Sequence, residues 1–458
     1  MTELLNQYFR GVLPTPVHFA VGTPLSVDSG YFCFGQDTVC YGRTGQGYRS
    51  EKADQPLYDA HKNLSSEGCK IQLPFDPTEV VTNLRQERYV HNGGNGSGNS
   101  RADLARQLYY AMRPLLPLGV RSHLQKIYLR NWRNRPFPAW PVDFTVEMLM
   151  KELLLLGLKT AGLQSIPFIW FWPDGASACS IMTHDVEAEP GKQFCSTLMD
   201  IDDEFKIPAS FQIVPEHRYP VPRDYIEEIK TRGFEVNVQD LNHDGRLFWE
   251  YEEFKRRADK INRYGWEFGA AGFRSAILYR NQEWYGALDY FKYDMSVPNV
   301  AHLDPQPGGC CTVMPYFIGN MLELPLTTTQ DHSLFHILGD YSMGLWRRQI
   351  DLILNHNGLI SFIVHPDYII EARAQAVYRS LLAELTQLRA DKNVWIAQPR
   401  EVNWWWRARA EMNIVRKEGQ WVIEGTGKER ARIAFASVHE DKVVYSLPER
   451  STVLELVS

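Results

Sequence analysis

From Ser177 onward the chain alternates short apolar or β-branched runs with amphipathic segments. The runs ACSIMTHDVE, ASFQIVP and FEVNVQDL are separated or followed by helical patterns such as RDYIEEIKTRG and YEEFKRRADKINRYG. This alternation is typical of a parallel sheet or an α/β barrel, because parallel neighbouring strands need a crossover between them. In such a barrel the loops after the strands carry the chemistry. The polar residues at the strand ends are therefore the candidate functional residues.

The remaining sequence divides around this region. Short aromatic and apolar runs punctuated by glycine and proline predict a β-rich N-terminal region over residues 1–90, and HNGGNGSGNS predicts a flexible linker or loop at 91–100. Apolar positions at helical spacing predict a helical segment over 101–165. The α/β region then spans 166–400. A helix and four short strand-like runs predict a small antiparallel β appendage over 401–458.

Composition and charge exclude several classes of protein. Of the 458 residues, 44 % are hydrophobic and 23 % are charged, which predicts a packed globular protein. The net charge of −6 provides no broad positive field, so no nucleic-acid partner is expected. The most apolar stretches are interrupted by charges or fall short of the about 20 residues of a membrane span. The start MTELLNQYFR lacks the features of a signal peptide, which predicts a cytoplasmic protein.

Three of the predicted strands end in residues that could carry out chemistry. The segment THDVE places Asp185 and Glu187 two positions apart, so both side chains leave the strand on the same side. The segment QDLNHDG offers Gln239 and His243, and SFIVHPD offers His365. A single polar residue at a strand end is more often a turn former or a helix cap. Their recurrence at three strand ends predicts a functional site.

These motifs resemble those of the polysaccharide deacetylases of carbohydrate esterase family 4, over about residues 177–400. In that family the first motif supplies an aspartate that acts as general base and a second acid that binds a metal. Asp185 and Glu187 match these two positions. The second motif is His-x-x-x-His, with both histidines on the metal, and the matching residues here are Gln239 and His243. One histidine of the family's motif is therefore replaced by an amide.

The other motifs of the family follow in the same order. Arg274 matches the arginine that orients the base, although Ala276 stands where the family has proline. Asp294 lies in a segment similar to the family's cluster of aromatic and Asp residues, and His365 matches the histidine that acts as general acid. The resemblance implies a distorted, deacetylase-type β/α barrel. It also implies a hydrolase that removes N-acetyl groups from amino-sugar glycans or their precursors.

A divalent metal held by Glu187, Gln239 and His243 is a further implication of the resemblance. These ligands carry the same single negative charge as the family's Asp, His and His. An amide oxygen is a poorer ligand for zinc than an imidazole nitrogen, which shifts the preference toward harder ions such as cobalt or manganese. Three outcomes remain open: a metal-dependent deacetylase, a hydrolase of C–N bonds that needs no metal, and a non-catalytic glycan-binding or scaffold protein of polysaccharide biosynthesis.

A second histidine pair needs separate consideration. His332 and His336 in QDHSLFHILG have the spacing that can place two imidazoles on one helix face. The segment lacks the adjacent glutamate of an HExxH motif. We therefore expect capping or core roles for these histidines rather than a second metal site.

Overall fold

The computed structural model describes residues 3–11, 17–22, 24–35, 38–45, 49–90, 127–129 and 131–448. The predicted linker at 91–100 and the predicted helical residues 101–126 lie outside these ranges. The chain divides into two compact units, and each contains stretches that are far apart in the sequence. Unit 1 comprises Met1–Gln86, Phe144–Ser177 and Trp404–Ser458, and unit 2 comprises Glu87–Asp143 and Ala178–Asn403.

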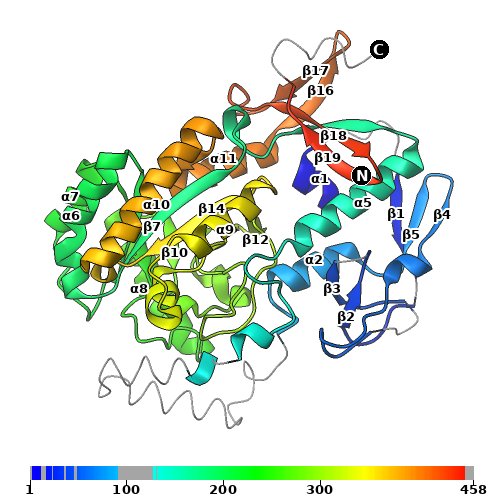
Figure 1. Ribbon diagram of the computed structural model, residues 1–458. Helices are drawn as coiled ribbons and strands as arrows, with labels where there is room; N and C mark the ends of the chain where they lie inside the picture. The colour runs from blue at the N-terminus through cyan, green and yellow to red at the C-terminus, as the bar shows by residue number, and fades with distance from the viewer. Residues whose placement is uncertain are drawn as a thin grey trace. The chain divides into compact units, whose positions relative to one another are not determined.

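Unit 2 alternates strands and helices, as the sequence pattern predicts, and helices α6, α8 and α10 lie along its strands in Figure 1. Its elements are β7 (Cys179–Val186), α6 (Glu189–Phe205), β8 (Ala209–Ile213), α7 (Arg223–Thr231), β9 (Glu235–Gln239), α8 (Tyr251–Phe268), β10 (Gly272–Arg274), β11 (Tyr293–Asp294), β12 (Tyr316–Ile318), β13 (Met321–Glu323), the π-helix η7 (His332–Leu338), α9 (Gly344–Leu354), β14 (Leu359–Val364), α10 (Ala372–Asp391) and β15 (Trp395–Ala397). Its short 3-10 helices are η3 (Trp132–Asn134), η5 (Ala276–Leu278), η6 (Gln282–Ala287) and η8 (Pro366–Tyr368).

The strands of unit 2 form one nine-stranded sheet in the order β12-β13-β11-β10-β9-β8-β7-β14, with β15 also paired to β7. Neighbouring strands are parallel except for β12 and β13. The segment after β13 bonds both to β14 and to the segment after β11, which lie far apart in the strand order, so the sheet curls. Thr328 N donates to Ser361 O at 3.3 Å, and Asn299 N donates to Leu326 O at 2.7 Å. Unit 2 is therefore a mixed α/β structure with a curled sheet, as the barrel prediction requires.

Strand β7 occupies the middle of this arrangement and is buried along its whole length. Along one edge it pairs with β14 from Cys179 to His184. Its other edge is shared, because β15 pairs with its first three residues and β8 pairs from Met182 to Val186. A parallel strand covered on both faces is expected to be a nearly continuous apolar run. The polar residues that end β7 therefore stand out against the rest of the strand.

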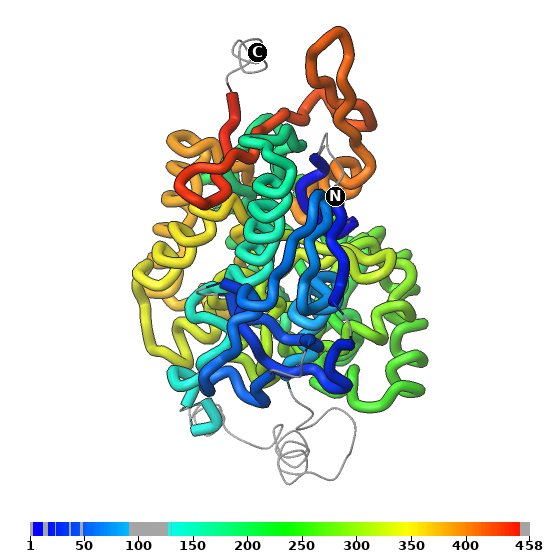
Figure 2. Tube along the Cα trace, turned by 90° about the vertical axis from the view of Figure 1, so that its right-hand side faces the viewer, coloured from blue at the N-terminus to red at the C-terminus, as the bar shows by residue number. Residues whose placement is uncertain are grey.

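Unit 1 gathers strands from both ends of the chain. Its elements are α1 (Glu3–Phe9), β1 (His18–Val21), β2 (Gly30–Cys33), β3 (Val39–Gly42), η1 (Ala60–Asn63), β4 (Ser65–Glu67), β5 (Lys70–Leu73), α2 (Pro77–Arg85), α5 (Thr145–Ala161), β6 (Ser165–Ile169), η4 (Pro173–Gly175), the second part of α11 (Pro399–Glu411), β16 (Asn413–Lys417), β17 (Gln420–Glu424), β18 (Ile433–His439) and β19 (Lys442–Ser446). Strands β1, β5 and β4 form one sheet, and β1 and β5 run side by side in Figure 2. Strand β6 joins the hairpin of β18 and β19, while β2 with β3 and β16 with β17 form two-stranded sheets.

A buried arginine connects three stretches of the chain within unit 1. The Arg409 guanidinium donates to the main-chain oxygens of Tyr8 at 3.0 Å, Phe9 at 3.2 Å and Ile169 at 2.7 Å. These carbonyl groups belong to α1 and β6, whereas Arg409 belongs to α11. Hydrogen bonds from a charged donor are stronger than neutral ones. Arg409 therefore helps to hold the N-terminal and C-terminal parts of unit 1 together.

In the part of the chain that the structure describes, no helix combines the length and the apolar character needed to cross a bilayer.

Gly272 begins β10 at a position where a side chain has no room. A Cβ atom there would collide with the Tyr293 ring and lie 2.7 Å from Asn237 Oδ1. We expect Gly272→Ala to lower the free energy of unfolding by about 1–3 kcal/mol, because an extra methyl group must displace packed neighbours. Urea denaturation followed by circular dichroism measures this change. At Gly286 no atom of the described residues, apart from the local backbone, lies within 4 Å of the Cβ position. Gly286→Ala is therefore the control, and equal losses in the two variants would contradict the packing argument.

Candidate active site

The register of the parallel strands brings the predicted residues to one edge of the sheet. Val364 of β14 pairs with His184 of β7, so His365 comes level with Asp185. Two strands away, Gln239 ends β9 and pairs with Arg274 at the end of β10. Parallel strands all end on the same side of a sheet. The polar strand ends recognised in the sequence therefore meet in space.

Glu187 is the residue on which these side chains converge. Its Oε1 accepts a hydrogen bond from Gln239 Nε2 at 3.0 Å, and it lies 2.7 Å from His243 Nε2 and 3.5 Å from His365 Nε2. Gln239 Nε2 also donates to Asp185 Oδ2 at 3.1 Å. One amide group thus bridges the two carboxylates. Asp185 and Glu187 after β7, Gln239 and His243 after β9, and His365 after β14 therefore form a single, largely buried cluster.

Glu187 and His365 hold each other in their charged forms. Burial raises the pKa of Glu187, but the neighbouring His243 and His365 outweigh it and hold this pKa well below its usual value. Burial lowers the pKa of His365, but Asp331 and Glu187 outweigh it and hold this pKa well above its usual value. At neutral pH Glu187 is therefore ionised and His365 is an imidazolium. A protonated, buried imidazole can act as a general acid.

Asp185 is compensated less completely than Glu187. Burial raises the pKa of Asp185, and Arg274 and His365 offset only part of this rise. Arg274 Nη1 lies 3.5 Å from Asp185 Oδ1, and its Nη2 donates to Thr183 Oγ1 at 3.1 Å, which fixes the guanidinium beside the acid. A carboxylate whose pKa is shifted toward neutrality is better matched to accepting a proton at neutral pH. The two carboxylates of the cluster are thus chemically different.

Asp331 is a residue of this cluster that the sequence interpretation missed. Its Oδ1 lies 2.6 Å from His365 Nδ1, and its Oδ2 accepts a hydrogen bond from His365 N at 2.7 Å. A carboxylate on Nδ1 fixes the orientation of the imidazole and favours its charged form. The available signal was the aspartate in QDHSLFH, directly before the two histidines that were considered as metal ligands.

Those two histidines lie in the π-helix η7, which begins directly after Asp331. The ring centroids of His332 and His336 are 5.6 Å apart, and His336 and His365 both contact the Tyr368 ring, with centroids at 4.7 and 4.8 Å. π-helical turns are rare and frequently occur at functional sites. The pair therefore borders the cluster around His365.

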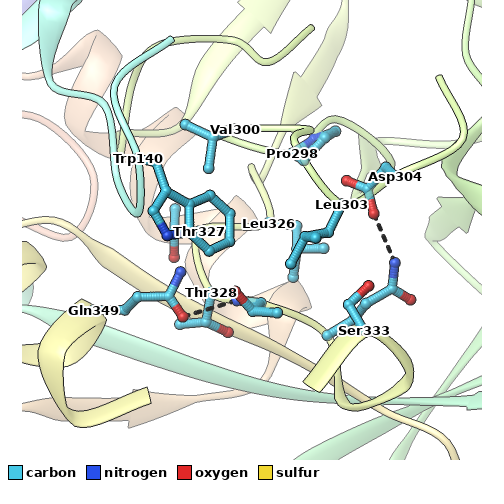
Figure 3. Close-up of a pocket in the computed structure, with 12 residues that line it drawn as sticks. Trp140, Pro298, Val300, Leu303, Asp304, Leu326, Thr327, Thr328, Ser333 and Gln349 are labelled. Atoms are coloured by element: carbon cyan, nitrogen blue, oxygen red, sulfur yellow. Dashed lines mark hydrogen bonds between the residues drawn. The ribbon is translucent and has the colours of Figure 1, made fainter. Parts of the chain in front are cut away.

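The main chain leading to Asp331 is held by polar contacts around a small cavity, which Figure 3 shows. The cavity has a volume of about 20 Å³, room for a single water molecule. Gln330 Nε2 donates to Asp304 Oδ1 at 2.9 Å, and Thr329 N donates to Gln349 Oε1 at 3.0 Å. These bonds fix the two residues before Asp331. These bonds help to hold the Asp331 carboxylate beside His365.

Asp294 lies apart from the cluster around Glu187. Its Oδ1 accepts a hydrogen bond from Ser296 Oγ at 2.7 Å, and its Oδ2 accepts one from Ser296 N at 3.1 Å. Burial and the adjacent Asp294 raise the pKa of Glu323 well above its usual value. Within the described residues, no hydrogen bond or ion pair joins Asp294 to Asp185 or Glu187. Asp294 thus belongs to a second acidic pair, between β11 and β13.

Three side chains offer donor atoms at distances suited to a metal ion. One ligand atom each from Asp185, Glu187 and His365 lies within 4.8 Å of the others. Carboxylate oxygen and imidazole nitrogen are ligands of zinc and of other divalent transition metals. Gln239 directs Nε2 rather than its amide oxygen at both carboxylates. Of the predicted ligands Glu187, Gln239 and His243, only Glu187 belongs to this group. His243 contacts the group through Glu187.

Comparison with known proteins finds similar solved structures but no significant sequence match. No protein-family model matches the chain, and no curated protein matches it significantly. A Mycobacterium smegmatis protein assigned as a polysaccharide deacetylase is 20 % identical, with 52 % of this chain and 93 % of that chain covered and a TM-score of 0.43. A protein from Pseudomonas aeruginosa PAO1 with the same assignment is 12 % identical over 52 % and 93 % of the two chains, with a TM-score of 0.42.

A third structure is a pseudoenzyme of carbohydrate esterase family 4 from Bacillus anthracis. It is 12 % identical, with 50 % of this chain and 66 % of that chain covered and a TM-score of 0.33. The three TM-scores are all below 0.5, so these similarities do not assign the chain to a family.

Removing the Asp331 charge should lower the pKa of His365. We expect Asp331→Asn to shift this pKa toward the lower value that burial alone favours, because an amide cannot stabilise the imidazolium by charge. A pH titration of the His365 ring signals by NMR measures the shift. Asp340→Asn is the control, since Asp340 accepts a hydrogen bond from Ser342 N in a nearby loop. An unchanged pKa of His365 in Asp331→Asn would contradict the assignment.

The same interaction sets a pH dependence of stability. Because the pKa of His365 is raised by folding, its contribution to stability is complete below the unfolded value of about 6.5 and is lost as the pH rises through the folded pKa. In Asp331→Asn this loss should occur at lower pH than in the parent. Thermal unfolding measured across a pH series distinguishes the two.

Proposed function

We propose that the chain is a hydrolase of carbon–nitrogen bonds that removes N-acetyl groups from amino-sugar glycans or their precursors. The observation that carries the proposal is the convergence of Asp185, Gln239, His243 and His365 on Glu187. A buried carboxylate and a buried imidazolium at one site are the base and the acid that amide hydrolysis needs. The resemblance of the five motifs to those of polysaccharide deacetylases supports the same reaction and gives the substrate class.

In the proposed reaction a water molecule attacks the acetyl carbonyl carbon, and Asp185 takes the proton of that water. Arg274 keeps the Asp185 carboxylate oriented. As the C–N bond breaks, His365 gives its proton to the leaving amine, so the products are acetate and a free amino group. Asp331 is a positioning residue, because it holds the His365 ring and keeps it charged.

The Glu187 carboxylate and the His243 imidazole, 2.7 Å apart, offer donor atoms for a divalent ion. The ion would be held by Glu187 and His243, with Gln239 in the position of the family's other histidine. When bound, such an ion supplies polarisation of the acetyl carbonyl and a lower pKa of the attacking water. Zinc, cobalt and manganese are the candidate ions.

A second candidate function is a metal-independent hydrolase of C–N bonds. The observation in its favour is the Gln239 amide, which donates to both carboxylates and thereby holds them together without a cation. Acetate release that persists after treatment with a chelator would favour this candidate. Absence of acetate release from all acetylated amino sugars would favour a non-catalytic glycan-binding or scaffold protein.

Replacing the proposed base should abolish turnover without unfolding the protein. We expect Asp185→Asn to lower the rate of acetate release from N-acetylated chitooligosaccharides by about 10²- to 10⁴-fold, the usual contribution of a general base. The amide keeps the shape of the side chain, so the circular dichroism spectrum should not change. Asp224→Asn, at an exposed position of α7, is the control. Unchanged turnover in Asp185→Asn would exclude Asp185 as the base.

Restoring an imidazole at position 239 should strengthen metal binding. We expect Gln239→His to raise the affinity for zinc or cobalt at least about tenfold, since loss of even a second-shell partner of a metal costs about 10- to 100-fold. Titration calorimetry of the parent and the variant measures this. Gln387→His, on an exposed position of α10, controls for the addition of a surface histidine. An equal gain in both variants would show that residues 187, 239 and 243 do not form one metal site.

A further inference from the structure

An open groove lies at the beginning of β10 and β11. Its volume is about 580 Å³, within the roughly 300–1,000 Å³ of small-molecule sites. It is lined by residues of the last turns of α8, by the connection to β10 and by the segment before β11: Asn262, Arg263, Trp266, Gly269, Ala270, Ala271, Asp289, Tyr290 and Lys292. Lys292 N donates to Ala271 O at 2.8 Å, which joins the two sides of the groove through the main chain.

The groove is separate from the candidate active site. Ala271 precedes β10, whereas Arg274 ends it beside Asp185. About 10 Å of extended chain separates Ala271 from Arg274, at about 3.3 Å per residue. The groove thus lies at the end of the sheet where strands begin, and the candidate active site lies where they end. A ligand in one does not occupy the other.

Two aromatic rings line the groove, and one of them is open to solvent. Trp266 is 73 % exposed, although tryptophan is highly buried on average. The Tyr290 ring packs against Gly265 of α8, where a Cβ atom would lie 2.6 Å from Tyr290 Cδ1. Tyr290 is therefore held against the helix. The groove offers a large apolar surface beside a second, fixed ring.

Polar groups stand at the edge of the same surface. Asn262 Nδ2 donates to Asp289 Oδ1 at 2.9 Å and to Ala287 O at 2.9 Å, so the amide holds the carboxylate in place. Asp289 Oδ2 has no hydrogen-bond partner among the described residues and is available to a ligand. The cationic side chains of Arg263 and Lys292 line the groove as well. Acceptor and donor groups thus flank the aromatic surface.

We propose that this groove binds a sugar ring of a glycan chain, at a site remote from catalysis. A pyranose has an apolar C–H face that can lie on the Trp266 indole, and it has hydroxyl groups that can bond to Asp289 and to the cations. An apolar protein segment would instead remove water from the Asp289 carboxylate without supplying a partner for its Oδ2, which is costly. The choice of an N-acetylated glycan rests on the proposed function. The groove would let the protein hold a long substrate while the active site acts on another residue of it.

The test uses the full chain carrying Asp185→Asn, which keeps the probe chitotetraose intact. Calorimetric titration should give two binding events per chain, and Trp266→Ala should weaken one of them by roughly tenfold or more. Asp289→Asn should weaken the same event. Trp404→Ala is the matched control, since Trp404 is also exposed, at 47 %, and belongs to unit 1. It should leave both events unchanged.

Three results would overturn the groove proposal: equal binding by the Trp266→Ala protein and its parent, no second event in the parent, or an oligomer of the parent that Trp266→Ala dissociates in sedimentation. The last result would make the groove a protein contact. Failure of the proposed function is distinguishable from these outcomes. A chain with Asp185 intact that releases no acetate but binds chitotetraose through Trp266 would refute the deacetylase and retain the groove.

Discussion

The chemistry of the cluster depends on one charge, the ionised carboxylate of Glu187, whose side chain is only 18 % exposed. A buried carboxylate is costly unless it is paired and hydrogen-bonded. Gln239, His243 and His365 meet that requirement together at Oε1. The same charge helps to keep His365 protonated and raises the pKa of Asp185. One compensated acid thus raises the pKa of both neighbours, which keeps a proton on His365 and makes Asp185 a better proton acceptor.

The position of Glu187 depends in turn on how β7 is held from its other face. His184 precedes Asp185 and faces the opposite side of the strand, where its Nε2 lies 2.9 Å from Asp202 Oδ2 of α6. Tyr378 of α10 donates to the other oxygen of Asp202. These three side chains are fully buried. Two helices are therefore tied to β7 directly behind the residues of the cluster, which favours a precise placement of Asp185.

The sequence predicted those parts of the fold that are encoded locally. Period-two alternation and apolar runs indicate β7, β8, β9 and β14, and a strand end can be read from the residues on either side of it. Pairings between distant segments cannot be read in this way. An example is β6 with β18, where Ser165 pairs with Ser437. Nothing in the segment SIPFI identifies its partner strand, because strand propensity reports fit to a surface rather than the identity of a neighbour.

The residues of the candidate site likewise fall into those that local sequence reveals and those that it does not. Asp185, Glu187 and His365 were recognisable because each ends or follows a strand of regular sequence. Asp331 was not, since it follows a segment that joins the sheet by single hydrogen bonds and has no strand pattern of its own. The direction of the Gln239 amide was equally inaccessible. Whether an amide presents oxygen or N–H depends on its neighbours, and here those neighbours are two carboxylates that arrive from another strand.

Arg274 limits which proton movements the cluster can support. Its guanidinium lowers the pKa of both Asp185 and Glu323, but burial and Asp294 keep the pKa of Glu323 well above its usual value. An arginine cannot release its own proton under these conditions. If Asp185 alone gained a proton, the cluster and the buried Arg274 would together gain one positive charge, which is unfavourable in a buried site. In the proposed reaction Asp185 gains a proton while His365 loses one, so the total charge of the cluster stays constant. The imidazolium must therefore give up its proton in the same cycle in which the base is protonated, and the pair Asp331 and Glu187, which holds that proton on His365, sets how readily this happens.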